Sequence, residues 1–334
     1  MIDLSQLSPM MQHYMETKKE YPDCVLFYRL GDFYEMFFDD ALTVSKELEI
    51  TLTGKDCGLS ERAPMCGVPF HALDSYLYRL VQKGYKVAIA EQMEDPRQAK
   101  GLVKREVIRV VTPGTITSSQ VLDETKNNYL MGIVYMDGIY GISTADISTG
   151  DFMVTEVDSD RELFDEINKF SPSEIICNNA FYMSGVDMDE LKNRYQVVIS
   201  ALDSRFFGEE SCRRILMEHF KVGALVGLGL EDYATGIIAA GAVMQYIYET
   251  QKSTLEHITT ITPYSTGQYM VIDTSTRRNL ELVETMREKQ KRGTLLWVLD
   301  KTKTAMGARL LRACIEQPLI HRDEIIKRQN AVEE

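Results

Sequence analysis

The hydrophobic and polar positions of the first 113 residues alternate in short blocks that predict both helices and strands. In residues 71–84, apolar side chains recur at three- and four-residue steps and stop at Gly84, as in an amphipathic helix closed by a glycine cap. The other blocks are a helix starting at Pro9, a β-rich segment 24–30, a helical segment 39–50 and a strand 85–93. This part of the chain is predicted to form a compact α/β domain with a mixed sheet.

A second α/β domain is predicted after a segment with linker composition, TPGTITSSQ (112–120). Three short β segments are broken at Asp137-Gly138 and Thr149-Gly150, and a helix and a further strand follow. The long helix 231–251 is apolar on most sides. Its apolar stretch is short and flanked by acids, so we expect buried packing rather than a membrane span.

From residue 273 the pattern predicts helices only, in STRRNLELVETMREK, GTLLWVLDKT and AMGARLLRACIEQPL. The chain stops within an apparent helix, so we expect an all-α domain that has been entered but not completed. The predicted domains are a first domain 1–113, a linker 114–126, a second domain 127–252 and the start of a helical domain 263–334.

The charge is unevenly distributed along the chain. The formal net charge of −13 would ordinarily argue against binding a polyanion, because affinity for nucleic acid depends on neutralised phosphates. Residues 1–113 carry −3, residues 114–272 carry −13 and residues 273–334 carry +3. The acidity belongs to the middle third, so a DNA-binding face at either end remains open.

Composition predicts a cytoplasmic protein with reduced cysteines. No basic-then-apolar order at the N-terminus indicates a secretory signal. The cysteines have no C-x-x-C spacing and no histidine at metal-binding spacing, which favours buried free thiols. They are Cys24, Cys57, Cys66, Cys177, Cys212 and Cys314.

Enzyme chemistry has little support in the sequence. The phosphate-binding pattern G-x-x-x-x-G-K-[ST] is absent, and the five histidines are isolated. Asp137, Asp146 and Asp151 lie on or beside predicted strands, where carboxylates can hold divalent ions for a metal-dependent nuclease. Asp137 and Asp151 lie at glycine turns and Asp146 at a local bend, where aspartate favours local backbone hydrogen bonds instead, and we keep the nuclease as the less favoured alternative.

The stretch FYRLGDFYEMF (27–37) contains the most distinctive candidate site. In an extended segment, alternation places Phe33, Glu35 and Phe37 on one face, with Phe33 and Glu35 about 7 Å apart. An aromatic plane beside a carboxylate is suited to a single base pair, since apolar wedges can partly unstack a base step from the minor groove. The alternative is an aromatic core strand with a solvent-facing Glu35.

A basic window follows this stretch at residues 97–113, with a net charge of +4. Such a cluster is usually a solvated edge, but beside a DNA-facing wedge it would supply phosphate contacts. Its members are Arg97, Lys100, Lys104, Arg105 and Arg109.

Five segments resemble the MutS family of DNA mismatch-repair proteins, in the family's order. They are LFYRLGDFYEMFFDDA (26–41), APMCGVPFHALDSYL (63–77), VAIAEQMEDP (87–96), REVIRVVTPGT (105–115) and TRRNLEL (276–282). The resemblance implies a mismatch-binding domain, an RNase H-like connector without catalytic acids, and the opening of a helical core. It also identifies the chain as an N-terminal fragment.

The resemblance implies that Phe33 stacks on a mispaired or unpaired base and that Glu35 hydrogen-bonds the same base. It places Lys55, Met65 and Arg105 near residues that line the DNA, although TGKDCGLSER departs from the family in length and charge.

The family likeness further implies a homodimer in the full-length protein and a MutL-like partner bound through the connector. It places an ATPase, with ATP and Mg²⁺ as cofactors, beyond residue 334, so this chain itself is expected to be no enzyme and to hold no cofactor. Like the family, the protein would be cytoplasmic and associated with the nucleoid when bound to DNA. An interaction fragment with little DNA binding of its own remains the second alternative.

Overall fold

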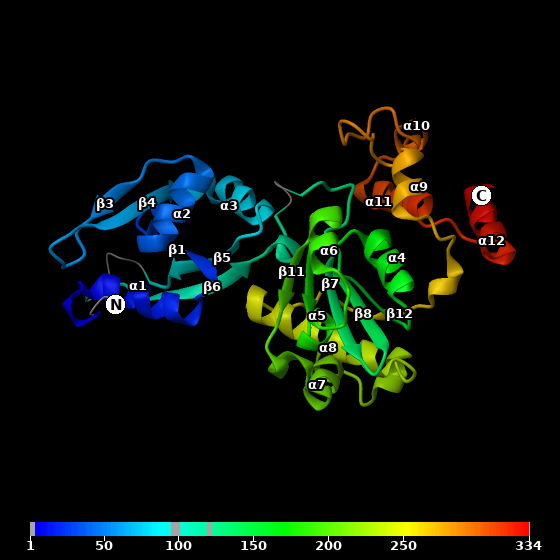
Figure 1. The fold of residues 1–334 in the computed structure, drawn as a ribbon, viewed down its shortest axis with the longest axis horizontal. Coiled ribbons are helices and arrows are strands. Elements are labelled where there is room, and N and C mark those ends of the chain that lie inside the picture. Colours follow the sequence, from blue (N-terminus) through cyan, green and yellow to red (C-terminus); the bar gives the residue numbers. More distant parts are fainter. Residues whose placement is uncertain (1–3, 95–100, 119–121, 334) are drawn as a thin grey trace. The chain divides into compact units, whose positions relative to one another are not determined.

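The computed structural model describes residues 4–94, 101–118 and 122–333. It divides into two units, one formed by Met1–Val121 with Ile247–Thr254 and the other by Leu122–Tyr246 with Leu255–Glu334. Both units contain a mixed sheet with helices, and further helices follow the second sheet (Figure 1). This confirms the predicted fold class of two α/β parts followed by helices.

The first unit is built on one mixed six-stranded sheet of order β3-β4-β2-β1-β5-β6. Its strands are β1 (Cys24–Leu30), β2 (Phe33–Phe37), β3 (Thr53–Lys55), β4 (Ala63–Pro69), β5 (Lys86–Gln92) and β6 (Arg105–Val111). All neighbours pair antiparallel except β1 and β5, which are parallel. The chain therefore needs a crossover between β1 and β5, and the helices α2 (Phe38–Leu48) and α3 (Leu73–Gln82) lie within that stretch.

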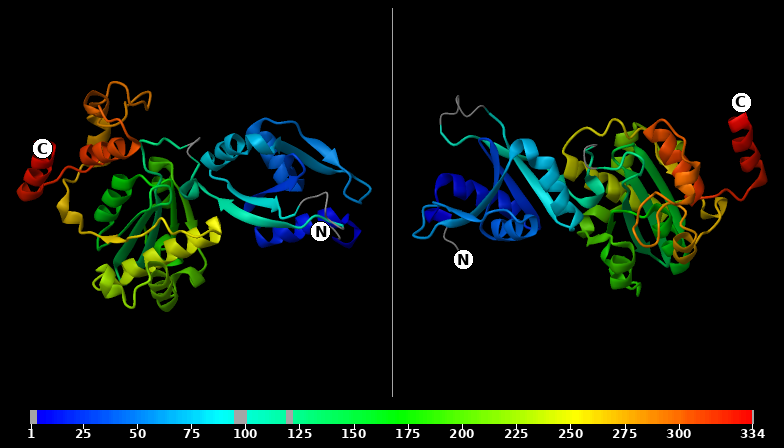
Figure 2. Two further views of the ribbon diagram at one scale, coloured as in Figure 1. Left: turned by 180° about the vertical axis from the view of Figure 1, so that it is seen from behind. Right: turned by 90° about the horizontal axis from the view of Figure 1, so that it is seen from above.

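Helices cover both faces of this sheet (Figure 2). They are α1 (Pro9–Glu20), α2 (Phe38–Leu48) and α3 (Leu73–Gln82), with short 3₁₀ turns at Leu4–Gln6, Phe70–Ala72 and Pro113–Thr115. Tyr34 and Met36 pack in one core with α2 and α3, whereas Phe37 packs in the other core with α1. Because successive side chains of β2 point to opposite faces of the sheet, the strand contributes side chains to two separate cores.

The start of the predicted linker is packed inside the first unit rather than solvated. Thr112 and Thr115 are fully buried and form a reciprocal capping box around the 3₁₀ turn. The Thr/Pro/Gly composition that suggested a linker here makes a tight buried turn, because the two hydroxyls satisfy the backbone groups that the turn leaves open. Residues 119–121 lie outside the described part of the chain.

The second unit contains a sheet of order β11-β10-β7-β8-β9-β12. Its strands are β7 (Leu130–Met136), β8 (Ile139–Asp146), β9 (Asp151–Val157), β10 (Glu174–Cys177), β11 (Val198–Ala201) and β12 (Thr262–Pro263). The first three are antiparallel, and β10 and β11 then add parallel on the other side of β7. This is the strand order of an RNase H-like fold.

Helices pack on both faces of the second sheet, and glycines allow one of them to approach closely. The helices are α4 (Asp160–Phe170), α5 (Asn179–Tyr182), α6 (Met188–Tyr195), α7 (Glu209–Phe220) and α8 (Ala234–Gln251), with 3₁₀ turns at Ser204–Phe207 and Leu225–Leu228. A Cβ at Gly141 would lie 2.4 Å from the backbone oxygen of Thr235 in α8. This helix is the apolar segment predicted to be buried, and its residues 237–244 are buried throughout.

The remaining helices are α9 (Thr274–Asn279), α10 (Leu295–Leu299), α11 (Ala305–Glu316) and α12 (Arg322–Glu333), after a 3₁₀ turn at Thr266–Gln268. The helix predicted over 275–289 ends at Asn279, and Leu282 and Val283 pack against Leu296 from a stretch of turns. None of the helices in the described ranges has the length and apolar character needed to cross a membrane.

Candidate nucleic-acid interface

Strand β2 presents Phe33 to solvent while burying its neighbours. Tyr34, Met36 and Phe37 are almost completely buried, but Phe33 is 46% exposed. The ring of Phe37 meets that of Tyr14 edge-on, with centroids 5.0 Å apart, so α1 closes that end of the strand. An aromatic side chain left half in water at the other end of the same strand is available for a partner.

Gly67 lies between Phe33 and Glu35 on this face and, having no side chain, leaves an open space between them. It pairs with Glu35 across β4 and β2. A Cβ at this position would lie 3.5 Å from Cγ of Glu35 and 3.8 Å from Cδ1 of Phe33. The two side chains therefore flank the same open position on one face of the sheet, which agrees with their predicted side-by-side placement. Sequence reasoning missed Gly67, although a glycine inside a strand often marks such a close approach.

Lys55 lies next to Glu35, and its ammonium is 2.6 Å from Oε2 of the carboxylate. The side chain of Glu35 is 17% exposed and that of Lys55 is 34% exposed. The ammonium also lies 5.6 Å from the ring centroid of Phe37. The structure thus brings the sequence-predicted Lys55 to the candidate site, as the counterion of Glu35.

Met65 lies at the margin of the same face. It pairs with Phe37 on one side and with Thr53 on the other, and it packs partly buried against the core below α1. Its neighbours are thus the buried end of β2 and the edge strand, and it contributes apolar surface there.

The opposite face of β2 is anchored by Tyr34. Its hydroxyl donates to Glu91 at 2.6 Å, and the Arg29 guanidinium pairs with the same carboxylate at 3.5 Å and lies 5.4 Å from the Tyr34 ring centroid. Burial, and then the Glu91 carboxylate, raise the pKa of Tyr34 to about 12. These contacts tie β2 to β5 and hold the backbone that carries Phe33 and Glu35.

Arg105 is buried and its guanidinium is used inside the protein. Nε donates to the carbonyl of Arg29 at 2.8 Å, and another guanidinium nitrogen donates to Val103 at 2.7 Å. The guanidinium also lies 5.2 Å from the ring centroid of Tyr28, and the residue is only 6% exposed. The structure gives Arg105 the role of joining β6 to β1, and it offers no support for the predicted DNA contact.

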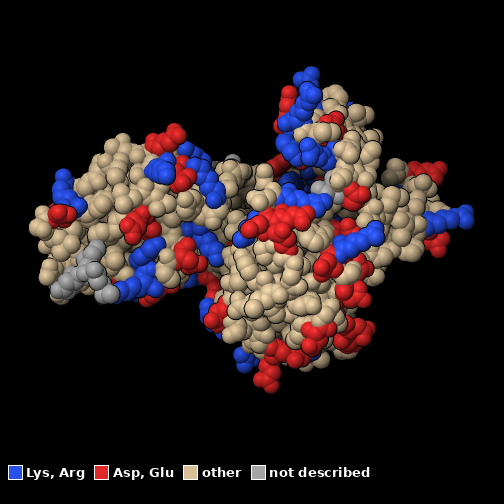
Figure 3. All heavy atoms as spheres, viewed as in Figure 1, with Lys and Arg blue, Asp and Glu red and all other residues tan. Residues whose placement is uncertain are grey.

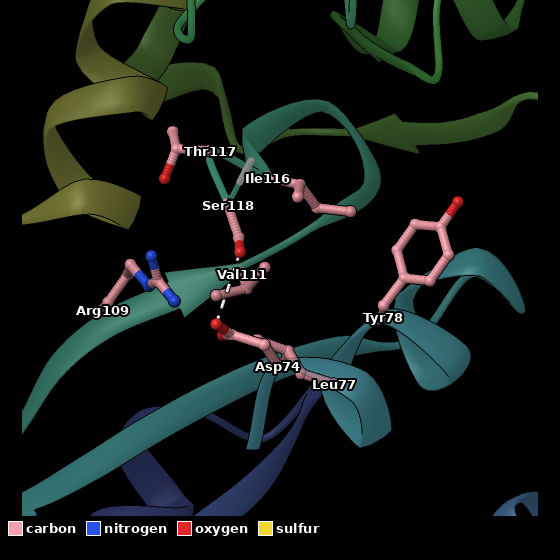
Figure 4. Close-up of a pocket in the computed structure, with 8 residues that line it drawn as sticks. All are labelled: Asp74, Leu77, Tyr78, Arg109, Val111, Ile116, Thr117 and Ser118. Carbon is pink, nitrogen blue, oxygen red and sulfur yellow. Dashed lines mark hydrogen bonds between the residues drawn. The ribbon is translucent and has the colours of Figure 1, made fainter. Parts of the chain in front are cut away.

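Arg109 lies in a small pocket with residues of α3, as Figure 4 shows. The pocket is lined by Asp74, Leu77, Tyr78, Arg109, Val111, Ile116, Thr117 and Ser118. Burial lowers the pKa of Arg109. Leu77 and Val111 belong to the core beneath α2 and α3, whereas Arg105 lies with Tyr28 on the α1 side. Arg109 is therefore not on the face that carries Phe33 and Glu35.

Lys104 is the one predicted basic residue of this window that is exposed in the described part of the chain. It pairs with Glu106 at 2.6 Å, and this partner raises the pKa of Lys104. Arg97 and Lys100 lie outside the described residues. The three described members of the basic window thus form no single patch: one is exposed, one is buried and one faces the other side of the sheet.

Two of the three aspartates of the nuclease alternative lie together and the third does not. Asp146 and Asp151 are partners across β8 and β9, and both accept a hydrogen bond from the side-chain amide of Asn127. Asp146 is fully buried and accepts hydrogen bonds from Asn127, the Asn128 amide and both donors of Ser148. Asp137 takes a positive φ in the turn at the opposite end of β8, roughly 25–30 Å away by strand rise. The described residues contain no group of His, Cys, Asp or Glu suited to a metal ion. The carboxylates are structural, and the geometry leaves the nuclease unsupported.

Comparison with known families assigns each part of the chain. Residues 8–120 match the family model described as MutS domain I, residues 128–259 match MutS domain II, and residues 275–334 match MutS domain III. The chain belongs to the MutS family. The strand with Phe33 and Glu35 lies within the part that matches domain I, and the sheet of the second unit lies within the part that matches domain II.

Several curated MutS proteins are similar to this chain over almost its whole length. It is 63% identical over 331 residues to the DNA mismatch repair protein MutS of Lachnoclostridium phytofermentans, covering 99% of this chain and 36% of that protein. It is 54% identical over 334 residues to that of Acetivibrio thermocellus, covering 99% of the chain and 38% of the relative. The chain therefore spans little more than a third of the length of these relatives.

Proposed function

We propose that this chain carries the mismatch-sensing part of a DNA mismatch-repair protein. In this proposal, Phe33 stacks on a mispaired or unpaired base of duplex DNA and Glu35 hydrogen-bonds that base. The observation that carries it is the pairing of a 46% exposed phenylalanine with a carboxylate on the same face of β2, in the part of the chain that matches MutS domain I.

The chemistry of the two side chains suits a defective base pair. Inserting an apolar ring into a duplex partly unstacks a base step, at a cost of a few kcal/mol that is smallest where pairing is already broken. The ring then regains about 1–3 kcal/mol by stacking on the displaced base. Oε2 of Glu35 is engaged by Lys55, and Oε1 has no hydrogen-bond partner among the residues that the structure describes. That oxygen can accept a base N–H.

We propose that the wider protein acts in DNA mismatch repair, as the names of its MutS relatives indicate. We propose that it is a homodimer, that it binds and hydrolyses ATP with Mg²⁺ in a part outside this chain, and that it works in the cytoplasm at the nucleoid. A MutL-like partner would bind the domain II part. The acidic surface of that part supports such a contact, since Asp and Glu side chains gather on it in the view of Figure 3.

The alternative is an interaction fragment that hardly binds DNA. Fluorescence anisotropy at fixed salt can measure the DNA affinity of Phe33→Ala and of the parent protein. This comparison tests both the mismatch-sensing proposal and the alternative. The variant should lose about 5–150-fold in affinity for a mismatched duplex, the equivalent of 1–3 kcal/mol of stacking, and much less for matched duplex.

Phe70→Ala is a matched control, because Phe70 is 43% exposed in the same unit but lies under the Arg29 guanidinium at 4.1 Å. Its preference for mismatched DNA should be unchanged. If Phe33→Ala kept the parental preference, the wedge would be wrong, and an intact protein with no measurable DNA binding would favour the interaction fragment.

A further inference from the structure

The contact between Lys55 and Glu35 joins two strands that are not neighbours in the sheet. β3 pairs with β4, where Lys55 lies opposite Ala63, and β4 pairs with β2, where Gly67 lies opposite Glu35. Adjacent strands are about 4.8 Å apart, so the lysine side chain crosses the width of β4 to reach the carboxylate. It passes near the ring of Phe37, 5.6 Å from the ammonium. Only a long side chain can make this connection.

The pair addresses a problem of charge at a surface that meets DNA. A carboxylate facing the duplex is repelled by the phosphates, and side chains that are partly shielded from water feel this repulsion more than exposed ones do. The Lys55 ammonium cancels the charge of Glu35 locally. The ammonium donates a hydrogen bond to Oε2, and Oε1 has no hydrogen-bond partner within the described parts of the chain.

We propose that Lys55 is a positioning residue for base recognition: it neutralises Glu35 and holds its carboxylate so that one oxygen can accept a base N–H. The inference deepens the proposed function and rests on it. Lys55 then contributes to discrimination between mismatched and matched DNA. A lysine that only contacts a phosphate would instead weaken binding uniformly across sequences.

The test is a double-mutant cycle in the intact protein. Lys55→Met keeps the length of the side chain without its charge, and it is measured alone and combined with Glu35→Ala. The readout is the ratio of affinities for mismatched and matched duplexes of the same length, by anisotropy at fixed salt. Lys55→Met should lower this ratio about three- to tenfold, because the base contact is a hydrogen bond to a charged group that is no longer held. In the Glu35→Ala background it should change the ratio less than about twofold.

Lys55→Arg is the conservative control, since it keeps both the charge and the reach, and it should retain most of the parental ratio. Lys55→Gln replaces Lys55→Met if the latter fails to fold, as judged by its thermal unfolding. Equal losses for matched and mismatched DNA, with the ratio unchanged in both backgrounds, would overturn the proposal and make Lys55 a phosphate contact. A parent protein whose ratio is close to one, or whose ratio survives Phe33→Ala, would instead overturn the proposed function itself.

Discussion

Replacing Phe37 by alanine should destabilise the first unit far more than replacing Phe33, although both side chains lie on the same face of β2. Phe37 is 1% exposed and packs edge-on against Tyr14, with ring centroids 5.0 Å apart. Truncation of a buried phenylalanine leaves a cavity and costs about 3–5 kcal/mol. Phe33 is 46% exposed, so it loses only part of the transfer free energy and leaves no closed cavity, at a cost of about 1 kcal/mol.

Hydrogen exchange measured by mass spectrometry can separate these two effects. The chain has a single tryptophan, Trp297, which lies in the second unit, so tryptophan fluorescence would report on the wrong part of the protein. Under conditions where exchange follows the opening equilibrium, amides of β1 and β2 should lose about 150- to 5,000-fold in protection with Phe37→Ala and about fivefold with Phe33→Ala. Similar losses for the two variants would refute the reasoning, since Phe33 would then be a core residue and unavailable to a partner.

Two further predictions concern packing and alkaline stability. Gly141→Ala should destabilise the second unit by about 1–3 kcal/mol or more, because its methyl would press on the backbone of α8. Differential scanning calorimetry should show a lowered transition, and Gly223→Ala, at a position with open space around it, should not lower the transition to the same extent. Tyr34 has a folded pKa of about 12 against an ordinary value of 10.0, so its contribution to stability is present below pH 10 and is lost as the pH rises toward 12. Tyr34→Phe should flatten that part of a pH–stability curve measured by urea denaturation, and an unchanged slope would contradict the assignment.

Some of the strands, among them β1, β5 and β7 to β9, could be predicted from the sequence because their hydrophobic pattern is local, whereas β3, β4 and β6 were not predicted. Alternation alone placed Phe33 and Glu35 on one face, and the structure agrees. The basic residues Arg105 and Arg109 do not form one patch, because of a shift in strand pairing that side-chain alternation cannot predict. Arg105 and Arg109 are four residues apart and should share a face, but the pairing of β5 with β6 shifts between Ile89 and Ala90. One extra residue in a strand sends every later side chain to the other face.

Contacts between segments far apart in the chain could not be predicted from the sequence either. The pairing of Lys55 with Glu35 depends on the register of β3, β4 and β2, which the spacing of the residues does not contain. The helix expected over 275–289 ended at Asn279, since the burial of Leu282 and Val283 against Leu296 overrides the local helical preference.

Phe33 lies on a strand whose neighbouring side chains are packed in two cores. This placement affects the entropy of binding. A side chain on a mobile loop must be immobilised when a partner arrives, and this ordering reduces the affinity that the new contacts provide. The backbone of Phe33 is held on one side by β1 and on the other by β4, so little motion is left to lose there. For a ligand that meets this face, most of the ordering has been completed by folding, before any encounter takes place.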